Sequence, residues 1–138
     1  MSKSKKILYI STLCVLVLLV IFTVLSKFIF DAIIPVVETV KPVNMELLDG
    51  ETSRIYNTVI PYGAVIPGEY GRNYVYIVRE RKGLFGQEYY CVLVEVSIEN
   101  YNDLYAALGG WSVTVFDDVV LSSSKFLTSG EVVRVINK

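Results

Sequence analysis

The hydrophobic positions of this chain follow two patterns, a continuous run near the N-terminus and short alternating runs after it. Residues 7–26 carry no charge, and Leu, Val and Ile dominate. At about 1.5 Å per residue, a helix of this length spans about 30 Å, the hydrocarbon thickness of a bilayer. Lys27 lies close enough to the end of the run to reach the lipid headgroups, and residues 28–30 extend the apolar segment. We therefore predict a transmembrane helix over residues 7–30.

The charges that flank this run predict its orientation. Lys3, Lys5 and Lys6 precede it without any acidic residue. By the positive-inside rule, residues 1–6 are expected in the cytoplasm and residues 31–138 outside the cell membrane. A cleaved signal peptide is the alternative, but the run is longer than a usual signal core and no small-x-small cleavage motif follows it. We expect a single-pass membrane anchor.

Residues 31–53 are predicted to form an extended connector. Pro35 and Pro42 restrict its backbone to extended or turn conformations. The valines within residues 36–40 favour a short strand between the two prolines. Residues 44–53 are mostly polar and contain a glycine, which is typical of a loop or a tight linker.

Residues 54–138 show the patterns of short β-strands and turns. In the longest candidate, residues 88–98, the even-numbered positions from Tyr90 to Ile98 are all apolar or aromatic and share one face. We expect about seven or eight strands, no amphipathic helix, and a mainly-β fold: a small antiparallel β-barrel or β-roll after the transmembrane helix. The other strand candidates are residues 55–60, 64–66, 74–78, 111–116, 119–121 and 132–136, with residues 104–108 ambiguous and ended by Gly109 and Gly110.

Composition excludes several function classes. The chain has 138 residues and no histidine, which excludes a Ser-His-Asp triad, a Cys-His pair and a histidine-containing metal site. Two cysteines, Cys14 and Cys91, are too few for a disulfide scaffold or a four-cysteine zinc site. The net charge of −1 disfavours a nucleic-acid partner. We expect a non-enzymatic protein without a metal or cofactor.

The segment beyond the apolar run is acidic. From Asp31 onward there are nine basic and fourteen acidic residues, a net charge of −5. An acidic domain is soluble, but as a whole it is not an obvious binder of anionic lipid or wall polymer. Cys91 is expected as a buried free thiol on a strand, with an intermolecular disulfide as the alternative, and Cys14 as an ordinary residue in lipid.

Two short motifs suggest chemistry but have simpler interpretations. Asp117 and Asp118 are adjacent, and neighbours on a strand point to opposite faces, so their carboxylates cannot easily share a proton or a metal ion. A turn before the next strand is the simpler interpretation of this pair. Residues 122–125, Ser-Ser-Ser-Lys, are similar to a serine-lysine dyad, but no oxyanion loop or strand-to-helix elbow accompanies them. We predict no catalytic residue in either motif.

Residues 79–86 form a candidate contact surface. A charge run bounded by two glycines is typical of a solvated hairpin tip. Two apolar side chains at the turn itself indicate a contact with a partner or a tip that touches the membrane. The predicted partner-contact residues are Arg79, Arg81, Lys82, Leu84 and Phe85.

Four motifs of the chain, the last of them in two parts, occur in a recognisable order and spacing. They are Val-Ile-Pro-Tyr-Gly-Ala-Val at residues 59–65, Tyr-Val-Tyr-Ile-Val at 74–78, Val-Glu-Val at 94–96, and Asp-Val-Val-Leu-Ser at 118–122 followed by Thr-Ser-Gly-Glu-Val-Val-Arg-Val at 128–135. In this order and spacing, the motifs resemble those of the membrane-proximal domain of periplasmic adaptor subunits (membrane fusion proteins of the hemolysin-D type) from bacterial efflux and secretion systems. The lysine-rich start, the apolar run and residues 35–42 are similar to the anchored adaptors of Gram-positive-type bacteria.

The resemblance implies a membrane-anchored accessory subunit that docks on the outer face of a transporter of the ABC or the resistance-nodulation-division type. It also implies association of several copies. A full adaptor places lipoyl half-motifs, a coiled-coil hairpin and a β-barrel between the anchor and the domain expected at residues 54–138, where this chain has only residues 44–54. We therefore expect an adaptor reduced to these two parts. An independent anchored binding module for an envelope component is the alternative function.

Overall fold

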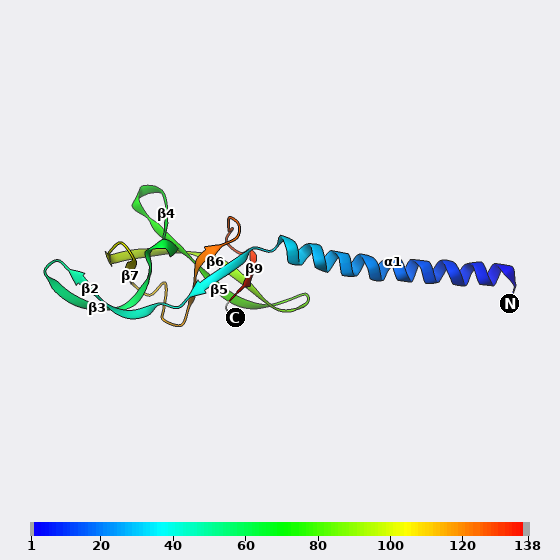
Figure 1. The fold of residues 1–138 in the computed structure, drawn as a ribbon, viewed down its shortest axis with the longest axis horizontal. Helices are drawn as coiled ribbons and strands as arrows, with labels where there is room; N and C mark the ends of the chain where they lie inside the picture. Colours follow the sequence, from blue (N-terminus) through cyan, green and yellow to red (C-terminus); the bar gives the residue numbers. More distant parts are fainter. Residues whose placement is uncertain (1, 137–138) are drawn as a thin grey trace. The chain divides into compact units, whose positions relative to one another are not determined.

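The computed structural model describes residues 2–136 and divides into two compact units between Ile34 and Pro35. The first unit is helix α1, Lys3–Ile33, labelled in Figure 1. It extends the predicted helix by a few residues at each end because no proline or glycine interrupts the segment before Pro35. All the described residues of this helix are exposed within the unit.

Three hydroxyl side chains hydrogen-bond to the backbone of α1. Ser2 caps the N-terminus, and its hydroxyl accepts a hydrogen bond from the Lys5 backbone N–H at 3.5 Å. The hydroxyls of Thr12 and Thr23 donate to backbone carbonyls one turn earlier, at 2.9 and 2.8 Å. By length and composition, α1 is long and apolar enough to cross a membrane.

The second unit consists of strands joined by short turns. Two 3₁₀ turns, η1 (Tyr62–Ala64) and η2 (Glu69–Gly71), flank the shortest strand. The strands are β1 (Val36–Val40), β2 (Val43–Asp49), β3 (Thr52–Pro61), β4 (Ile66–Pro67), β5 (Asn73–Gly83), β6 (Gly86–Tyr101), β7 (Tyr105–Gly109), β8 (Asp118–Ser123) and β9 (Val132–Val135).

Five of these strands close into a barrel. β5 pairs with β6, β6 with β9, β9 with β1, β1 with β8, and β8 again with β5. Every pair is antiparallel except β1–β9, which is parallel. The predicted mainly-β fold, with one apolar helix followed by a small β-barrel, is confirmed.

The interior of the barrel is filled by side chains from all five strands. Most of them are valines, whose branched side chains suit a pleated and closely packed surface. Cys91 is fully buried among them, and the Tyr76 hydroxyl donates to the Leu127 carbonyl at 2.7 Å. The buried residues of this cluster are Val37, Val78, Cys91, Val120, Val133 and Val135.

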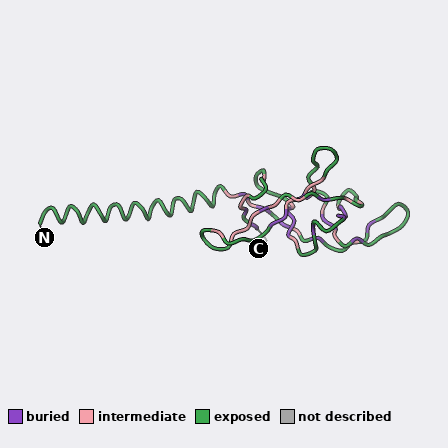
Figure 2. Tube along the Cα trace, turned by 180° about the vertical axis from the view of Figure 1, so that it is seen from behind, coloured by how far each residue is buried: buried purple, intermediate pink, exposed green. Residues whose placement is uncertain are grey.

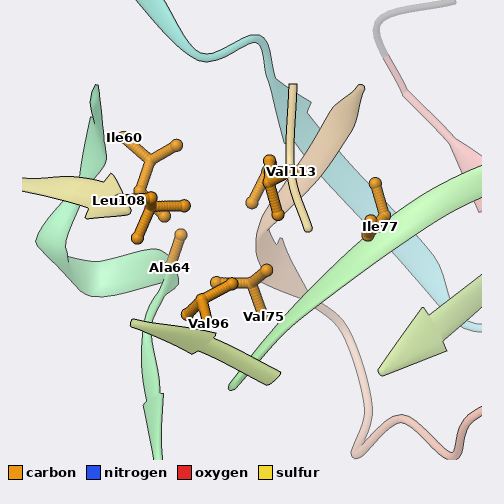
Figure 3. Packing of buried hydrophobic residues seen from close by; sticks show 8 residues of the cluster. Ile60, Ala64, Val75, Ile77, Val96, Leu108 and Val113 are labelled. Atoms are coloured by element: carbon orange, nitrogen blue, oxygen red, sulfur yellow. The ribbon is translucent and has the colours of Figure 1, made fainter. Parts of the chain in front are cut away.

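A second layer continues from the long strand β6. Residues 97–101 of β6 pair with β7, β7 pairs with β3, and β3 pairs with β2. Ile60 and Leu108 from this sheet share one buried cluster with Val75 and Ile77 from the barrel, and Figure 3 shows its members. β5 therefore buries one face in the barrel and the other against the second sheet, which explains its continuous apolar run. Figure 2 shows the buried residues gathered in these layers and the hairpin ends exposed.

The structure corrects the prediction for residues 31–53. Residues 36–40 form the predicted strand, but this strand belongs to the barrel, so the β domain begins at Pro35 and not at residue 54. Residues 44–53, predicted as a loop, contain most of β2 and the turn into β3. Their polar residues lie on the exposed face, while Leu47 is buried against Tyr56 and Val59.

Two further expectations differ from the structure. Residues 111–116 form a loop and not a strand, because Asp117 bonds the loop backbone in place of a neighbouring strand. Residues 79–82, predicted within a turn, continue β5 instead. In β6 the predicted apolar face is the better buried one from residues 92 to 98, but Cys91 on the opposite face is buried in the barrel.

Candidate binding surfaces

The β5–β6 hairpin carries all five residues predicted to contact a partner. β5 pairs with β6 down to Gly83 opposite Gly86, so Leu84 and Phe85 form the turn. Leu84 is 97% exposed and Phe85 is 85% exposed. The positive φ of the turn, +117°, falls on Gly86, which tolerates it because it has no Cβ. The hairpin thus presents two apolar side chains at its tip, as the sequence predicted.

Ion pairs position two of the three cationic side chains on this hairpin. Nε of Arg81 donates to Oε1 of Glu88 at 2.6 Å, and its guanidinium lies 4.7 Å from the ring centroid of Tyr90. Nη2 of Arg79 lies 3.9 Å from Oδ1 of Asp117. Exposed ion pairs contribute about 0–1 kcal/mol. These contacts therefore order the side chains more than they stabilise the domain.

A second surface, the aromatic groove, lies between residues 54–58 of β3 and residues 110–116. It has a volume of about 540 Å³, and Glu99 and Leu108 complete its lining. Trp111 and Phe116, at the two ends of the loop, are 94% and 84% exposed. Exposed aromatic side chains beside a concave surface are typical of protein contacts.

The aromatic groove borders an open edge of β3. Residues 52–56 pair with β2 on one side, whereas pairing with β7 on the other side begins only at Val59. Within residues 2–136, no strand pairs with residues 52–58 on the groove side. The backbone groups on that side are therefore available to an extended peptide, which can add a strand to an open sheet edge.

The loop that carries the two aromatic residues is held in one conformation. The Asp117 carboxylate accepts hydrogen bonds from the Thr114 backbone N–H at 2.8 Å and from its hydroxyl at 3.1 Å. Nζ of Lys41 donates to the Phe116 carbonyl at 3.3 Å, and Val113 is buried in the second layer. A loop fixed in advance loses little conformational freedom when it binds.

The two motifs with suspected chemistry have structural partners. Asp117 lies in the turn before β8, as predicted. Asp118 is the first residue of β8, and its Oδ1 lies 3.5 Å from Nζ of Lys41. In the serine-lysine motif, the Ser122 hydroxyl donates to Glu38 at 3.2 Å and the Ser123 hydroxyl donates to the Lys125 carbonyl at 2.7 Å. The first hydrogen bond joins β8 to β1, and the second joins the last residue of β8 to the loop that follows it.

Cys91 is a buried free thiol on a strand, as predicted. Its Sγ donates to the Thr128 carbonyl at 3.3 Å. Burial raises the pKa of the Cys91 thiol, and the nearby Glu131 carboxylate raises it further. The thiol therefore stays neutral and inaccessible in the folded domain, which disfavours an intermolecular disulfide through Cys91. Cys14 lies exposed along α1.

The described residues contain no group of three or more Cys, Asp or Glu side chains that could hold a metal ion. Comparison of the chain with protein families, with curated proteins and with solved structures finds no match. Function must therefore be argued from the two surfaces. The apolar hairpin tip is predictable from the sequence, whereas the aromatic groove was not predicted, although Trp111 directly after the glycine pair and Phe116 five residues later were a signal for it.

Proposed function

We propose that this protein is a membrane-anchored, non-enzymatic accessory subunit that docks on the outer face of an efflux or secretion transporter. α1 anchors the chain in the bilayer, and the lysines before it favour a cytoplasmic N-terminus. The β domain then lies outside, where its exposed surfaces meet the extracytoplasmic parts of the transporter.

Most of the motifs behind the adaptor resemblance support this proposal because they coincide with strands of one barrel, whereas residues 59–65 lie outside it, at the end of β3 and in η1. Residues 74–78 lie in β5, residues 94–96 in β6 and residues 118–122 in β8. Residues 128–135 contain the turn before β9 and β9 itself. Segments that are short and apolar in isolation thus supply four strands of the same closed ring.

The observation that carries the docking proposal is the aromatic groove. Its open β3 edge offers backbone hydrogen bonds to an extended segment of the partner, and Trp111 and Phe116 offer apolar contact area on a fixed loop. Aromatic side chains of this kind carry much of the binding energy at protein interfaces. The transporter would supply an extended loop or edge strand.

Affinity purification of the tagged full-length chain from its own membranes, in mild detergent, tests this function. We expect a polytopic transporter in near-stoichiometric amount by quantitative mass spectrometry. The double variant Trp111→Ala/Phe116→Ala is expected to lower that recovery about tenfold or more. Leu104→Ala, which removes a 70% exposed side chain from the β6–β7 turn, serves as the matched control. Equal recovery with wild type and the double variant would contradict docking through the groove.

An independent binding module remains the second candidate function. The observation that favours it is that the aromatic groove is complete within one chain and lined only by residues of the β domain. In that case the purification recovers the chain with soluble envelope components, and no polytopic protein depends on Trp111 and Phe116.

A further inference from the structure

We propose that the tip of the β5–β6 hairpin is a second membrane contact, at which Leu84 and Phe85 enter the headgroup region of the bilayer that α1 spans. The hairpin cations Arg81 and Lys82 would lie at the level of anionic headgroups. This inference needs the membrane anchor but no transporter, so it stands or falls separately from the proposed docking function.

The composition of the tip separates it from the other hairpin turns of the domain. The β2–β3 turn has Asp49 and Glu51 around Gly50, and the β6–β7 turn contains Asn102 and Asp103. The β5–β6 turn instead has two apolar residues, with Arg81 and Lys82 just before it. An apolar end beside cations is the combination that binds an anionic lipid surface.

The charge of the β domain is distributed unevenly, which allows such a contact despite the acidic total. The whole segment from residue 31 onward has a net charge of −5. Within residues 79–88, three basic residues face two acidic ones, and the ion pairs of Arg79 with Asp117 and of Arg81 with Glu88 place Lys82 as the cation next to the turn. Because exposed charges are screened beyond about 8–10 Å at physiological salt, a bilayer close to the tip experiences the local cations more than the distant acids.

The strand register puts the start of β1, where the chain enters the β domain, beside the base of this hairpin. Val36 pairs with Arg134 on β9, the preceding residue Val133 pairs with Tyr89, and Tyr89 pairs with Glu80. β1 therefore begins near the level of Glu80. The hairpin continues four residues past that level, about 13 Å at 3.3 Å per residue. Figure 1 shows this hairpin projecting from the barrel beside β9.

The covalent link limits how far the start of β1 can lie from the end of α1. Only Ile34 and Pro35 lie between the end of α1 and the start of β1. The three steps from Ile33 to Val36 extend about 11 Å at most, at about 3.6 Å per residue. A projection of about 13 Å can thus span this gap and reach the headgroup region, where interfacial segments bury their apolar side chains about 5–10 Å deep.

Depth-dependent fluorescence quenching of the full-length chain in vesicles tests the contact. The reporter is Phe85→Trp in a Trp111→Phe background, which leaves one tryptophan at the tip. The vesicles contain phosphatidylcholine and phosphatidylglycerol, with lipid brominated near the headgroup end of its chains. The control, Leu104→Trp in the same background, places the reporter on the turn beyond the opposite end of β6.

We expect quenching at position 85 to exceed that at position 104 about threefold or more, with a blue-shifted emission only at position 85. Replacement of phosphatidylglycerol by phosphatidylcholine, or Lys82→Glu, is expected to reduce the quenching at position 85. Far-UV circular dichroism and thermal unfolding check that each variant folds. Phe85 is 85% exposed, so its replacement leaves the core intact.

Equal quenching at positions 85 and 104 in folded variants would overturn the proposal. If Leu84→Ser/Phe85→Ser then lowers transporter recovery, the tip is a protein contact and not a lipid contact. Strong quenching at position 85 in vesicles that contain no other protein supports the lipid contact, whatever the outcome of the docking experiment.

Discussion

The closed barrel and the sheet that extends from it differ in how their strands are paired. Each strand of the ring has a neighbour on both sides, and β5 and β8 bury residues on both faces. In the outer sheet, β2 has one neighbour and residues 52–58 of β3 have one. The barrel therefore supplies stability, while the outer sheet keeps backbone groups available for a partner.

Substitution of an isoleucine in each region should give the largest difference. Ile77 of β5 is fully buried, whereas Ile55 of β3 is 69% exposed. Ile77→Ala is expected to lower the free energy of unfolding by about 2–5 kcal/mol, and Ile55→Ala by less than about 0.5 kcal/mol. Chemical denaturation in detergent measures both. Similar losses would show that the outer sheet contributes as much stability as the barrel.

The glycine pair that ends β7 should have the next largest effect. Gly110 adopts a φ of +75°, and a Cβ on Gly109 would approach the Glu99 side chain to 2.8 Å. Gly110→Ala is expected to cost about 1–2 kcal/mol, because L-residues disfavour this backbone region. Gly63→Ala is the matched control, since Gly63 has open space around its Cβ position. An unchanged melting temperature for Gly110→Ala would refute the requirement for glycine.

Titration of the barrel interior should have a smaller effect that appears only at alkaline pH. The pKa of the Cys91 thiol is raised in the folded state, mainly by burial. Unfolded chains ionise this thiol near pH 8.5, so its contribution to stability is complete below that pH and is lost as the pH rises towards the folded pKa. Melting temperatures from pH 7 to 10 should fall more steeply for wild type than for Cys91→Val. Parallel curves would exclude this contribution.

The smallest stability effect is expected at the aromatic groove. Trp111→Ala and Phe116→Ala remove exposed side chains, so each should change the free energy of unfolding by less than about 0.5 kcal/mol. A loss above about 2 kcal/mol in either variant, measured by denaturation, would mean that these aromatics pack in the domain. Their exposure would then be no sign of a binding surface.

The sequence predicts the elements whose patterns are local. The uncharged run gives α1, the valines of residues 36–40 give β1, and the alternation of residues 88–98 gives β6. The apolar turn at Leu84 and Phe85 could also be predicted from the sequence, because a hairpin tip depends on a few adjacent residues. Cys91 was predicted as buried from its strand alone.

The elements that depend on distant partners could not be predicted from their own residues. β2 appears polar because its outer face is exposed, and its strand character depends on pairing with β3. Residues 111–116 alternate like a strand, but Val113 and Asp117 fix them as a loop. The aromatic groove arises only beside the residues of β3 that precede Val59, where β7 no longer pairs with β3, a feature of tertiary structure.

The most direct test of the account is photo-crosslinking from the aromatic groove in native membranes. A photoreactive phenylalanine analogue is placed at position 116 of the full-length chain, with position 104 as the control. We expect a specific adduct with a polytopic transporter from position 116 and none from position 104. Adducts of equal yield from both positions, or adducts from position 116 with soluble proteins alone, would contradict docking on a transporter through this groove.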